Sequence, residues 1–163
     1  MHLEIERKFL LKSLPNIEPD DILCIDQFYM KNEEGVFERA RISVSQKTDE
    51  TKYIHTVKAL ISNGVCSEDE HELTKDEFED FKSKWITKED STYISKRRFI
   101  YKFGKLKWEV DMFESGYTLI VAEIEIPTRK YRLRIPDFIK EVLLIEVTGK
   151  QQFSNRSLSL KIN

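Results

Sequence analysis

The sequence is poor in the residues that mark several common protein classes. Its 163 residues include five glycines, four prolines and two cysteines, and no apolar run approaches the roughly 20 residues of a membrane-spanning helix. Cys24 and Cys66 lack CxxC spacing and zinc-ligand neighbours, so we expect reduced thiols. No glycine-rich phosphate loop, GxSxG motif or signal-peptide pattern is found, and we expect a cytoplasmic protein without a membrane partner.

An excess of charge of one sign is also lacking. The chain carries 27 Lys and Arg against 29 Asp and Glu, for a net charge of −2, although charged residues make up 34% of it. A balanced sequence of this kind has no overall basic field to attract nucleic acid, so we expect no nucleic-acid partner. The length predicts a single domain over residues 1–163, as a monomer or a homodimer.

What the sequence does contain is a set of polar, mostly like-charged pairs, each with its members two positions apart in an apolar, β-prone segment. Alternate residues of a strand share a face, so each pair lies on one face of its strand. Like charges on one face of an open sheet would be costly, but a closed barrel can enclose them if a metal–polyphosphate complex binds inside. The pairs are Glu4 and Glu6 (followed by Lys8), Arg39 and Arg41, Thr56 and Lys58, Glu70 and Glu72, Lys96 and Arg98, Glu109 and Asp111, and Glu123 and Glu125.

The order of the expected elements favours an antiparallel barrel. Strands are predicted over about residues 2–11, 22–30, 36–45, 52–60, a fifth ending near 73, 92–103, 106–114 and 118–126, with turns at 32–35 and 115–116. Thr74 and Glu77 fit a capping box before a helix over 75–86, which we place outside the barrel. A short helix is expected from Pro136, a last strand over 143–148, and a short C-terminal helix capped by Ser154. The predicted fold class is α+β, an eight-stranded antiparallel β-barrel with flanking helices.

The residue types in these pairs suggest phosphate chemistry. Mg²⁺ and Mn²⁺ prefer oxygen ligands, so the carboxylate pairs could hold one or two such ions. Phosphoryl transfer depends mainly on positioning and charge neutralisation, which the basic residues could supply. A lysine could activate water only if burial and neighbouring cations lower its pKa, as is plausible for Lys96 beside Arg98.

The same residues carry a resemblance that runs through nearly the whole chain. The opening EIERKF matches the ExExK signature of the CYTH superfamily, the triphosphate tunnel metalloenzymes. The match continues through QFYM at 27–30, the charge pairs in order, and EVTG with FSNRSLSL near the end. The resemblance implies an eight-stranded antiparallel triphosphate tunnel that binds a small triphosphate together with Mg²⁺ or Mn²⁺.

Roles for individual residues follow from the resemblance alone. It implies a first metal at Glu4, Glu6 and Glu125, with Glu123, Asp111 and Glu109 near it or at a second ion. It implies phosphate binding by Lys8, Arg39, Arg41, Lys58 and Arg98. Lys96 would activate water, assisted by Tyr29, and Glu70 and Glu72 would complete the lumen.

Two positions depart from the pattern of this family. Many relatives have an arginine where this sequence has Glu68, and an acidic residue often follows EVTG where this sequence has Lys150. The first change removes a potential phosphate clamp, and either change could alter substrate preference.

The predicted function is a Mg²⁺- or Mn²⁺-dependent triphosphatase that acts on a small triphosphate. Inorganic triphosphate is the first choice, with thiamine triphosphate and nucleoside triphosphates also considered, because the short chain and its opening resemble the compact bacterial triphosphatases. One alternative is a class IV-type adenylate cyclase, which would convert ATP to cyclic AMP and pyrophosphate. Another is a module that binds polyphosphate or nucleotides without turnover.

Overall fold

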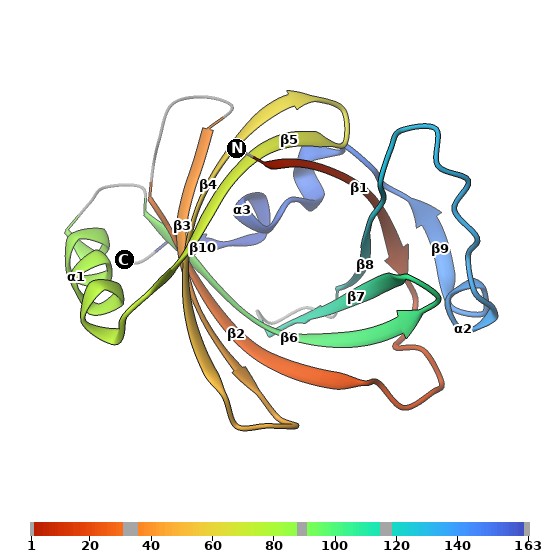
Figure 1. The fold of residues 1–163 in the computed structure, drawn as a ribbon, viewed down its shortest axis with the longest axis horizontal. Helices are drawn as coiled ribbons and strands as arrows, with labels where there is room; N and C mark the ends of the chain where they lie inside the picture. The colour runs from red at the N-terminus through yellow and green to blue at the C-terminus, as the bar shows by residue number, and fades with distance from the viewer. Residues whose placement is uncertain (1, 31–35, 88–90, 115–118, 162–163) are drawn as a thin grey trace.

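Eight antiparallel strands close into a barrel in the computed structural model, which describes residues 2–30, 36–87, 91–114 and 119–161 (Figure 1). Around the ring the order is β6-β2-β3-β4-β5-β1-β8-β7, and pairing of β7 with β6 closes it. The predicted barrel is confirmed, while the predicted turns at 32–35 and 115–116 lie outside the described residues. The strands are β1 (His2–Leu11), β2 (Asp21–Met30), β3 (Val36–Ser45), β4 (Thr51–Ser62), β5 (Val65–Leu73), β6 (Thr92–Phe103), β7 (Leu106–Phe113) and β8 (Ile120–Glu125).

Strand β1 has three partners. One edge pairs with β8 from Glu6 to Leu11, while the other edge pairs first with β5 and then, from Phe9 onward, with β9 (Leu143–Glu146). A two-residue strand, β10 (Leu160–Lys161), extends the sheet beside β6. The predicted last strand is therefore present but shorter, and β10 is too short to leave a periodic signal in the sequence.

The main hydrophobic core lies on the outside of the barrel wall. Residues that alternate with the charged pairs point outward from β1, β6, β7 and β8, and the segment 126–143 with helix α2 (Asp137–Lys140) packs over them. Burial of this outer layer supplies the hydrophobic stabilisation, so the inner face is left for polar side chains. The outer core includes Phe9, Leu11, Phe99, Tyr101, Trp108, Val110, Ala122, Ile124, Ile139 and Val142.

Helix α1 (Lys75–Ile86) packs on the barrel's outer surface, as predicted (Figure 1). The Thr74 side chain accepts from the Glu77 backbone N–H, and the Glu77 carboxylate accepts from the Thr74 N–H, which completes the capping box. Phe78 and Trp85 contact the Phe28 ring edge-on, and the Trp85 indole donates to the Tyr29 carbonyl. None of the described helices is long and apolar enough to cross a membrane.

The C-terminal segment turns into one end of the barrel. It forms a short 3₁₀ helix, η1 (Gln151–Phe153), and then α3 (Asn155–Leu158), which appears within the ring in Figure 1. The Ser154 hydroxyl accepts from the Ser157 N–H, so the predicted cap is present. Leu158 packs against inward-facing apolar residues of β2, β6, β7 and β8, and the segment therefore belongs to the lining of the barrel.

Candidate active site

The interior of the barrel is graded from acidic to apolar. Along β7 the inward-facing residues run from Glu109 through Asp111 to Phe113, and along β8 they run from Glu125 to Val121. We call the two ends of this gradient the acidic end and the apolar end. The acidic end comprises Glu4, Glu68, Glu70, Glu109 and Glu125, and the apolar end comprises Tyr29, Ile94, Phe113, Val121 and Leu158.

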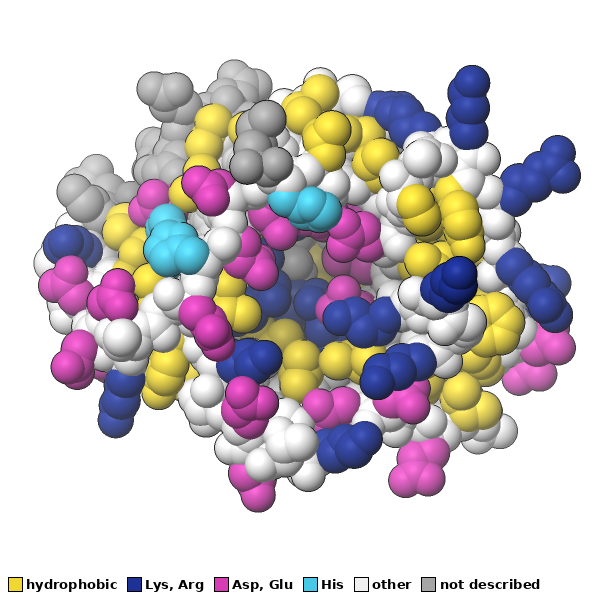
Figure 2. All heavy atoms as spheres, viewed as in Figure 1, with side chains coloured by type: hydrophobic (Ala, Val, Ile, Leu, Met, Phe, Trp, Pro, Cys, Tyr) yellow, Lys and Arg dark blue, Asp and Glu magenta, His cyan; other side chains and the backbone are white. Residues whose placement is uncertain are grey.

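Two adjoining cavities lie within the barrel. The larger, about 210 Å³, opens at the acidic end, and Figure 2 shows a hollow with acidic side chains at its edge and Lys or Arg inside. The smaller, about 110 Å³, is lined partly by Phe37 and Leu60 and by the C-terminal segment. Both cavities are lined by the same five residues, so they adjoin there: Glu6, Arg39, Lys58, Glu123 and Asn155.

Two lysines near the junction are held by carboxylates. Lys58 Nζ lies 2.9 Å from Glu4 Oε2 and 3.3 Å from Glu68 Oε2. Lys8 Nζ lies 3.2 Å from Glu123 Oε1 and 4.0 Å from Glu6 Oε1. Burial lowers the pKa of each lysine, but Glu123 and Glu6 raise the pKa of Lys8 above its usual value, and Glu4 and Glu6 do the same for Lys58. Both lysines are therefore cationic at neutral pH.

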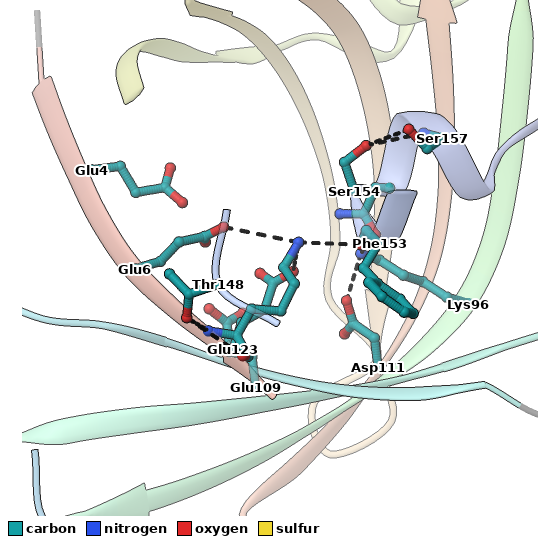
Figure 3. Close-up of polar contacts among 12 residues, drawn as sticks. Glu4, Glu6, Lys96, Glu109, Asp111, Glu123, Thr148, Phe153, Ser154 and Ser157 are labelled. Atoms are coloured by element: carbon teal, nitrogen blue, oxygen red, sulfur yellow. Dashed lines mark hydrogen bonds and ion pairs between the residues drawn. The ribbon is translucent and has the colours of Figure 1, made fainter. Parts of the chain in front are cut away.

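The carboxylates on this side are crowded. Burial and the neighbouring Glu123 raise the pKa of Glu6 well above its usual value, while burial and a hydrogen bond with Glu4 raise the pKa of Glu68 to about 7. Burial opposes ionisation of Glu4, yet its hydrogen bond with Glu68 and the charge of Lys58 lower its pKa. Figure 3 shows Glu4 and Glu6 extending from β1 into the same space. This crowding concentrates negative charge that a bound cation would neutralise.

Lys96 lies on the opposite wall, in a fully buried ionic cluster. Its Nζ lies 2.7 Å from Asp111 Oδ2 and donates to Asn155 Oδ1 at 3.1 Å, as the lower right of Figure 3 shows for Lys96 and Asp111. Arg98 contacts both oxygens of Asp111, at 2.8 and 2.9 Å, and also Glu109 at 2.7 Å. Burial, together with the charges of Arg98 and Arg41, lowers the pKa of Lys96 to about 7 in spite of Asp111. Lys96 thus has the proton affinity that a water activator needs near neutral pH.

The arginines of β3 complete the basic wall. Arg41 Nε donates to Gln27 Oε1 at 2.6 Å, and Gln27 in turn donates to the Tyr29 hydroxyl at 3.0 Å. Burial and the charges of Arg39 and Arg98 lower the pKa of Arg41 to about 9, so it remains charged at neutral pH. Arg39 Nε is buried and has no hydrogen-bond partner among the described residues. A buried donor of this kind is costly unless a ligand oxygen accepts from it.

The structure brings most of the predicted site residues to the two cavities. Lys96, Asp111 and Glu72 line neither of them. Lys96 and Asp111 lie behind Asn155 and are fully buried, whereas Glu72 is exposed near the end of β5, beyond the larger cavity. The predicted residues that do line a cavity are Glu4, Glu6, Lys8, Tyr29, Arg39, Arg41, Lys58, Glu70, Arg98, Glu109, Glu123 and Glu125.

Sequence analysis assigned no role to several residues that the structure places in the site. Gln27 is completely buried between Arg41 and Tyr29, and its position two residues before Tyr29 was the available signal. Asn155 and the Phe153 carbonyl, which accepts from Lys8 at 3.3 Å, come from the C-terminal segment. No strand alternation applies to that segment, so the pattern of charge pairs could not place it.

The described part of the chain holds no group of three Asp, Glu, His or Cys side chains already arranged as metal ligands. The predicted ligands are engaged with other residues instead: Glu4 with Lys58, Glu123 with Lys8, and Glu125 with His2 at 2.9 Å. A cation would therefore have to compete with these ammonium groups and the imidazole for the carboxylates.

Comparison with known proteins supports the fold. No protein-family model and no curated protein matches the chain. The inorganic triphosphatase NE1496 has a similar structure, with a TM-score of 0.60 and 24% identity over 99% of this chain and 97% of that one. The PH1012 protein from Pyrococcus horikoshii gives a TM-score of 0.56 at 20% identity, over 77% and 80% of the two chains. A candidate adenylate cyclase from Bacillus halodurans gives 0.54 at 15% identity, over 86% and 98%.

The strand topology and these neighbours show that the chain shares the closed, eight-stranded antiparallel barrel fold of these proteins. This is the fold that the resemblance in the sequence predicts. Among these three structures, that of the inorganic triphosphatase NE1496 has the highest identity and TM-score and covers the largest share of this chain.

Proposed function

We propose that this protein is a divalent-metal-dependent triphosphatase that hydrolyses a small triphosphate, with inorganic triphosphate as its first substrate. The observation that carries the proposal is the enclosed interior in which Lys8, Lys58, Arg39, Arg41 and Arg98 surround one space. Lys and Arg are the residues that bind phosphate oxygens, and Arg does so with bidentate geometry. The unpartnered Arg39 Nε supports an anionic ligand at the junction of the cavities.

The carboxylates fit a divalent cation by their chemistry. Glu4, Glu6 and Glu123 offer hard oxygen donors beside the basic wall, and the crowding that raises the pKa of Glu6 is the repulsion that a cation relieves. We assign these three as the principal ligands, with Glu109 and Glu125 nearer the acidic end. A bound Mg²⁺ or Mn²⁺ would supply charge neutralisation for the phosphates.

The basic residues divide into two roles under this proposal. Arg39, Arg41, Lys58, Arg98 and Lys8 orient the phosphate chain and neutralise the charge on the transferred group. Lys96 accepts the proton of the attacking water, since its pKa of about 7 leaves a large neutral fraction at neutral pH. Asn155 lines both cavities, and its Oδ1 accepts from Lys96, so Asn155 must turn aside for the attacking water to reach Lys96 Nζ and give up its proton directly.

Tyr29 is a secondary member of the proposed site. Its hydroxyl accepts from Gln27 and, at 3.5 Å, from Arg39. It therefore orients Arg39 toward the junction of the cavities. Asp111, with both oxygens on Arg98 and one also on Lys96, holds the basic wall in place.

A phosphate-release panel tests the proposal. Purified protein is incubated with inorganic triphosphate, thiamine triphosphate or ATP, each with Mg²⁺, Mn²⁺ or EDTA, and products are separated by ion-exchange chromatography. We expect the highest kcat/KM for inorganic triphosphate, and no release in EDTA. Glu6→Gln, which removes one carboxylate charge, should abolish metal-dependent release.

Two results would overturn the proposal in favour of the alternatives. Cyclic AMP and pyrophosphate formed from ATP would identify a cyclase. Metal-dependent binding of triphosphate without release of phosphate from any substrate would identify a binding module.

A further inference from the structure

Glu68 lies where it can compete with a phosphate for Lys58. Its side chain is 15% exposed, and its Oε2 lies 3.3 Å from Lys58 Nζ on the inner face of β5. The strand register places Glu68 directly opposite Lys58, and Glu4 contacts the same ammonium from β1 at 2.9 Å. Lys58 is thus held between two carboxylates, one from the neighbouring strand β5 and one from β1, the strand beyond β5.

Lys58 also lines both cavities, so the same ammonium faces the space proposed for the phosphates. Two carboxylates at contact distance neutralise its charge toward an incoming anion and repel that anion themselves. A cation bound by the carboxylates reverses both effects, because it replaces the ammonium as their partner and cancels their repulsion.

We propose that Glu68 is a specificity-determining residue that makes triphosphate binding conditional on a divalent cation. Together with Glu4 it holds Lys58 in the metal-free protein, and a cation at the carboxylates frees Lys58 for a phosphate. The inference rests on the proposed function, since it concerns the order in which metal and triphosphate occupy the same site. In this role Glu68 does not contact the phosphate; it competes with the phosphate for Lys58.

Isothermal titration calorimetry can measure the affinities for triphosphate and for the metal separately, under conditions in which no turnover occurs. Inorganic triphosphate is titrated into the wild-type protein, Glu68→Gln and Glu68→Asp in EDTA, and Mn²⁺ alone is titrated into each. A buffer of about pH 8.5 keeps a carboxyl with a pKa near 7 ionised. In EDTA, we expect Glu68→Gln to bind triphosphate about tenfold more tightly than the wild type, because one repelling charge is gone. Mn²⁺ should bind Glu68→Gln more weakly than the wild type.

Two variants separate this role from a general effect of charge or folding. Glu68→Asp keeps the carboxylate, so it should retain the weak metal-free binding of the wild type. Asp69→Asn removes the same charge one residue away, on the outer face of β5, and should leave both titrations unchanged. Thermal melts of all the variants establish that each is folded.

Different results would refute the role of Glu68 and the proposed function. If the wild type hydrolyses triphosphate with Mg²⁺ or Mn²⁺, but Glu68→Gln and Asp69→Asn match the wild type in EDTA, the role of Glu68 is refuted and the proposed function stands. If the wild type releases no phosphate with either metal, the proposed function falls. If, in addition, Glu68→Gln binds triphosphate no more tightly than the wild type in EDTA, the role of Glu68 falls as well.

Discussion

The two ends of the barrel shift the pKa of a buried lysine in opposite directions. Lys58, at the junction toward the acidic end, has its pKa raised by Glu4 and Glu6, although burial opposes this. Lys96, toward the apolar end, lies near Phe113 and beside Arg98, and its pKa falls to about 7. Lysine chemistry is the same in both places, so the surroundings decide which lysine stays cationic and which can accept a proton.

Under the proposed function, the difference between the ends would let one barrel both bind phosphate and activate water. Carboxylates near the opening keep Lys8 and Lys58 charged, and charged lysines bind phosphate. Apolar packing and neighbouring arginines near the other end make a neutral lysine accessible at neutral pH. Four experiments test whether the two lysines differ in this way.

Replacing Lys96 removes the proposed proton acceptor. We expect Lys96→Ala to lower kcat by about 10³-fold with little change in KM, since general base catalysis contributes on that order. Lys96→Arg should be equally slow, because a guanidinium does not give up its proton near neutral pH. Steady-state phosphate release measures both variants. An unchanged kcat in Lys96→Ala would show that Lys96 is not the proton acceptor and serves only as a structural partner of Asp111.

The pH dependence of kcat follows from the pKa of Lys96. A base with a pKa of about 7 is protonated and inactive below that value, so kcat should fall about tenfold per pH unit below it and level off above it. From pH 7 to pH 5 the expected loss is therefore about 50-fold, because the base is already half protonated at pH 7. Lys58 stays charged throughout this range and adds no inflection. Initial rates in constant-ionic-strength buffers measure the profile, and a kcat that rises toward low pH contradicts the assignment.

Replacing Lys58 tests the binding side of the comparison. We expect Lys58→Ala to raise KM by about 30-fold while kcat changes by less than about threefold, because a charge that contacts the phosphate contributes mainly to binding. The contrast with Lys96→Ala is the informative result. If Lys58→Ala lowered kcat as far as Lys96→Ala does, the two lysines would share one role.

Substitutions at the two ends should also differ, by a small amount, in their effect on the free energy of unfolding. Ile94→Val, which deletes one methyl group at the apolar end, should lower the free energy of unfolding by about 1 kcal/mol. Glu70→Gln, at the exposed acidic end, should change it by less than about 0.5 kcal/mol. Urea denaturation measures both values. Equal costs would mean that the apolar cluster does not anchor the interior.

Strand alternation explains why so much of the barrel could be predicted. Each charge pair marks two inward-facing positions, and the apolar residues between them, such as Val110 and Ile124, mark the outward face that forms the core. The capping box at Thr74 placed α1 with the same bounds that the structure shows. These features depend on residues close in sequence, and local patterns determine them.

The rest depends on contacts between distant residues. Glu72 satisfies the alternation of β5 but lies beyond the larger cavity, because spacing does not reveal where a strand leaves the barrel. Asn155 reaches Lys96 only because the C-terminal segment turns into the barrel, and nothing in its sequence has a strand period. Glu68 appeared in the sequence as the loss of an arginine, whereas its two-carboxylate hold on Lys58 emerges only when β1, β4 and β5 are assembled.

Gly149 decides how the chain enters the barrel. Its φ of +73° is a conformation that favours glycine, and a β-carbon there would lie 1.2 Å from the Asn63 side-chain oxygen at the tip of the β4–β5 hairpin. A larger residue at position 149 would be strained at this φ and would displace the Asn63 side chain. Glycine therefore lets the C-terminal segment and the β4–β5 hairpin lie in close contact at this point.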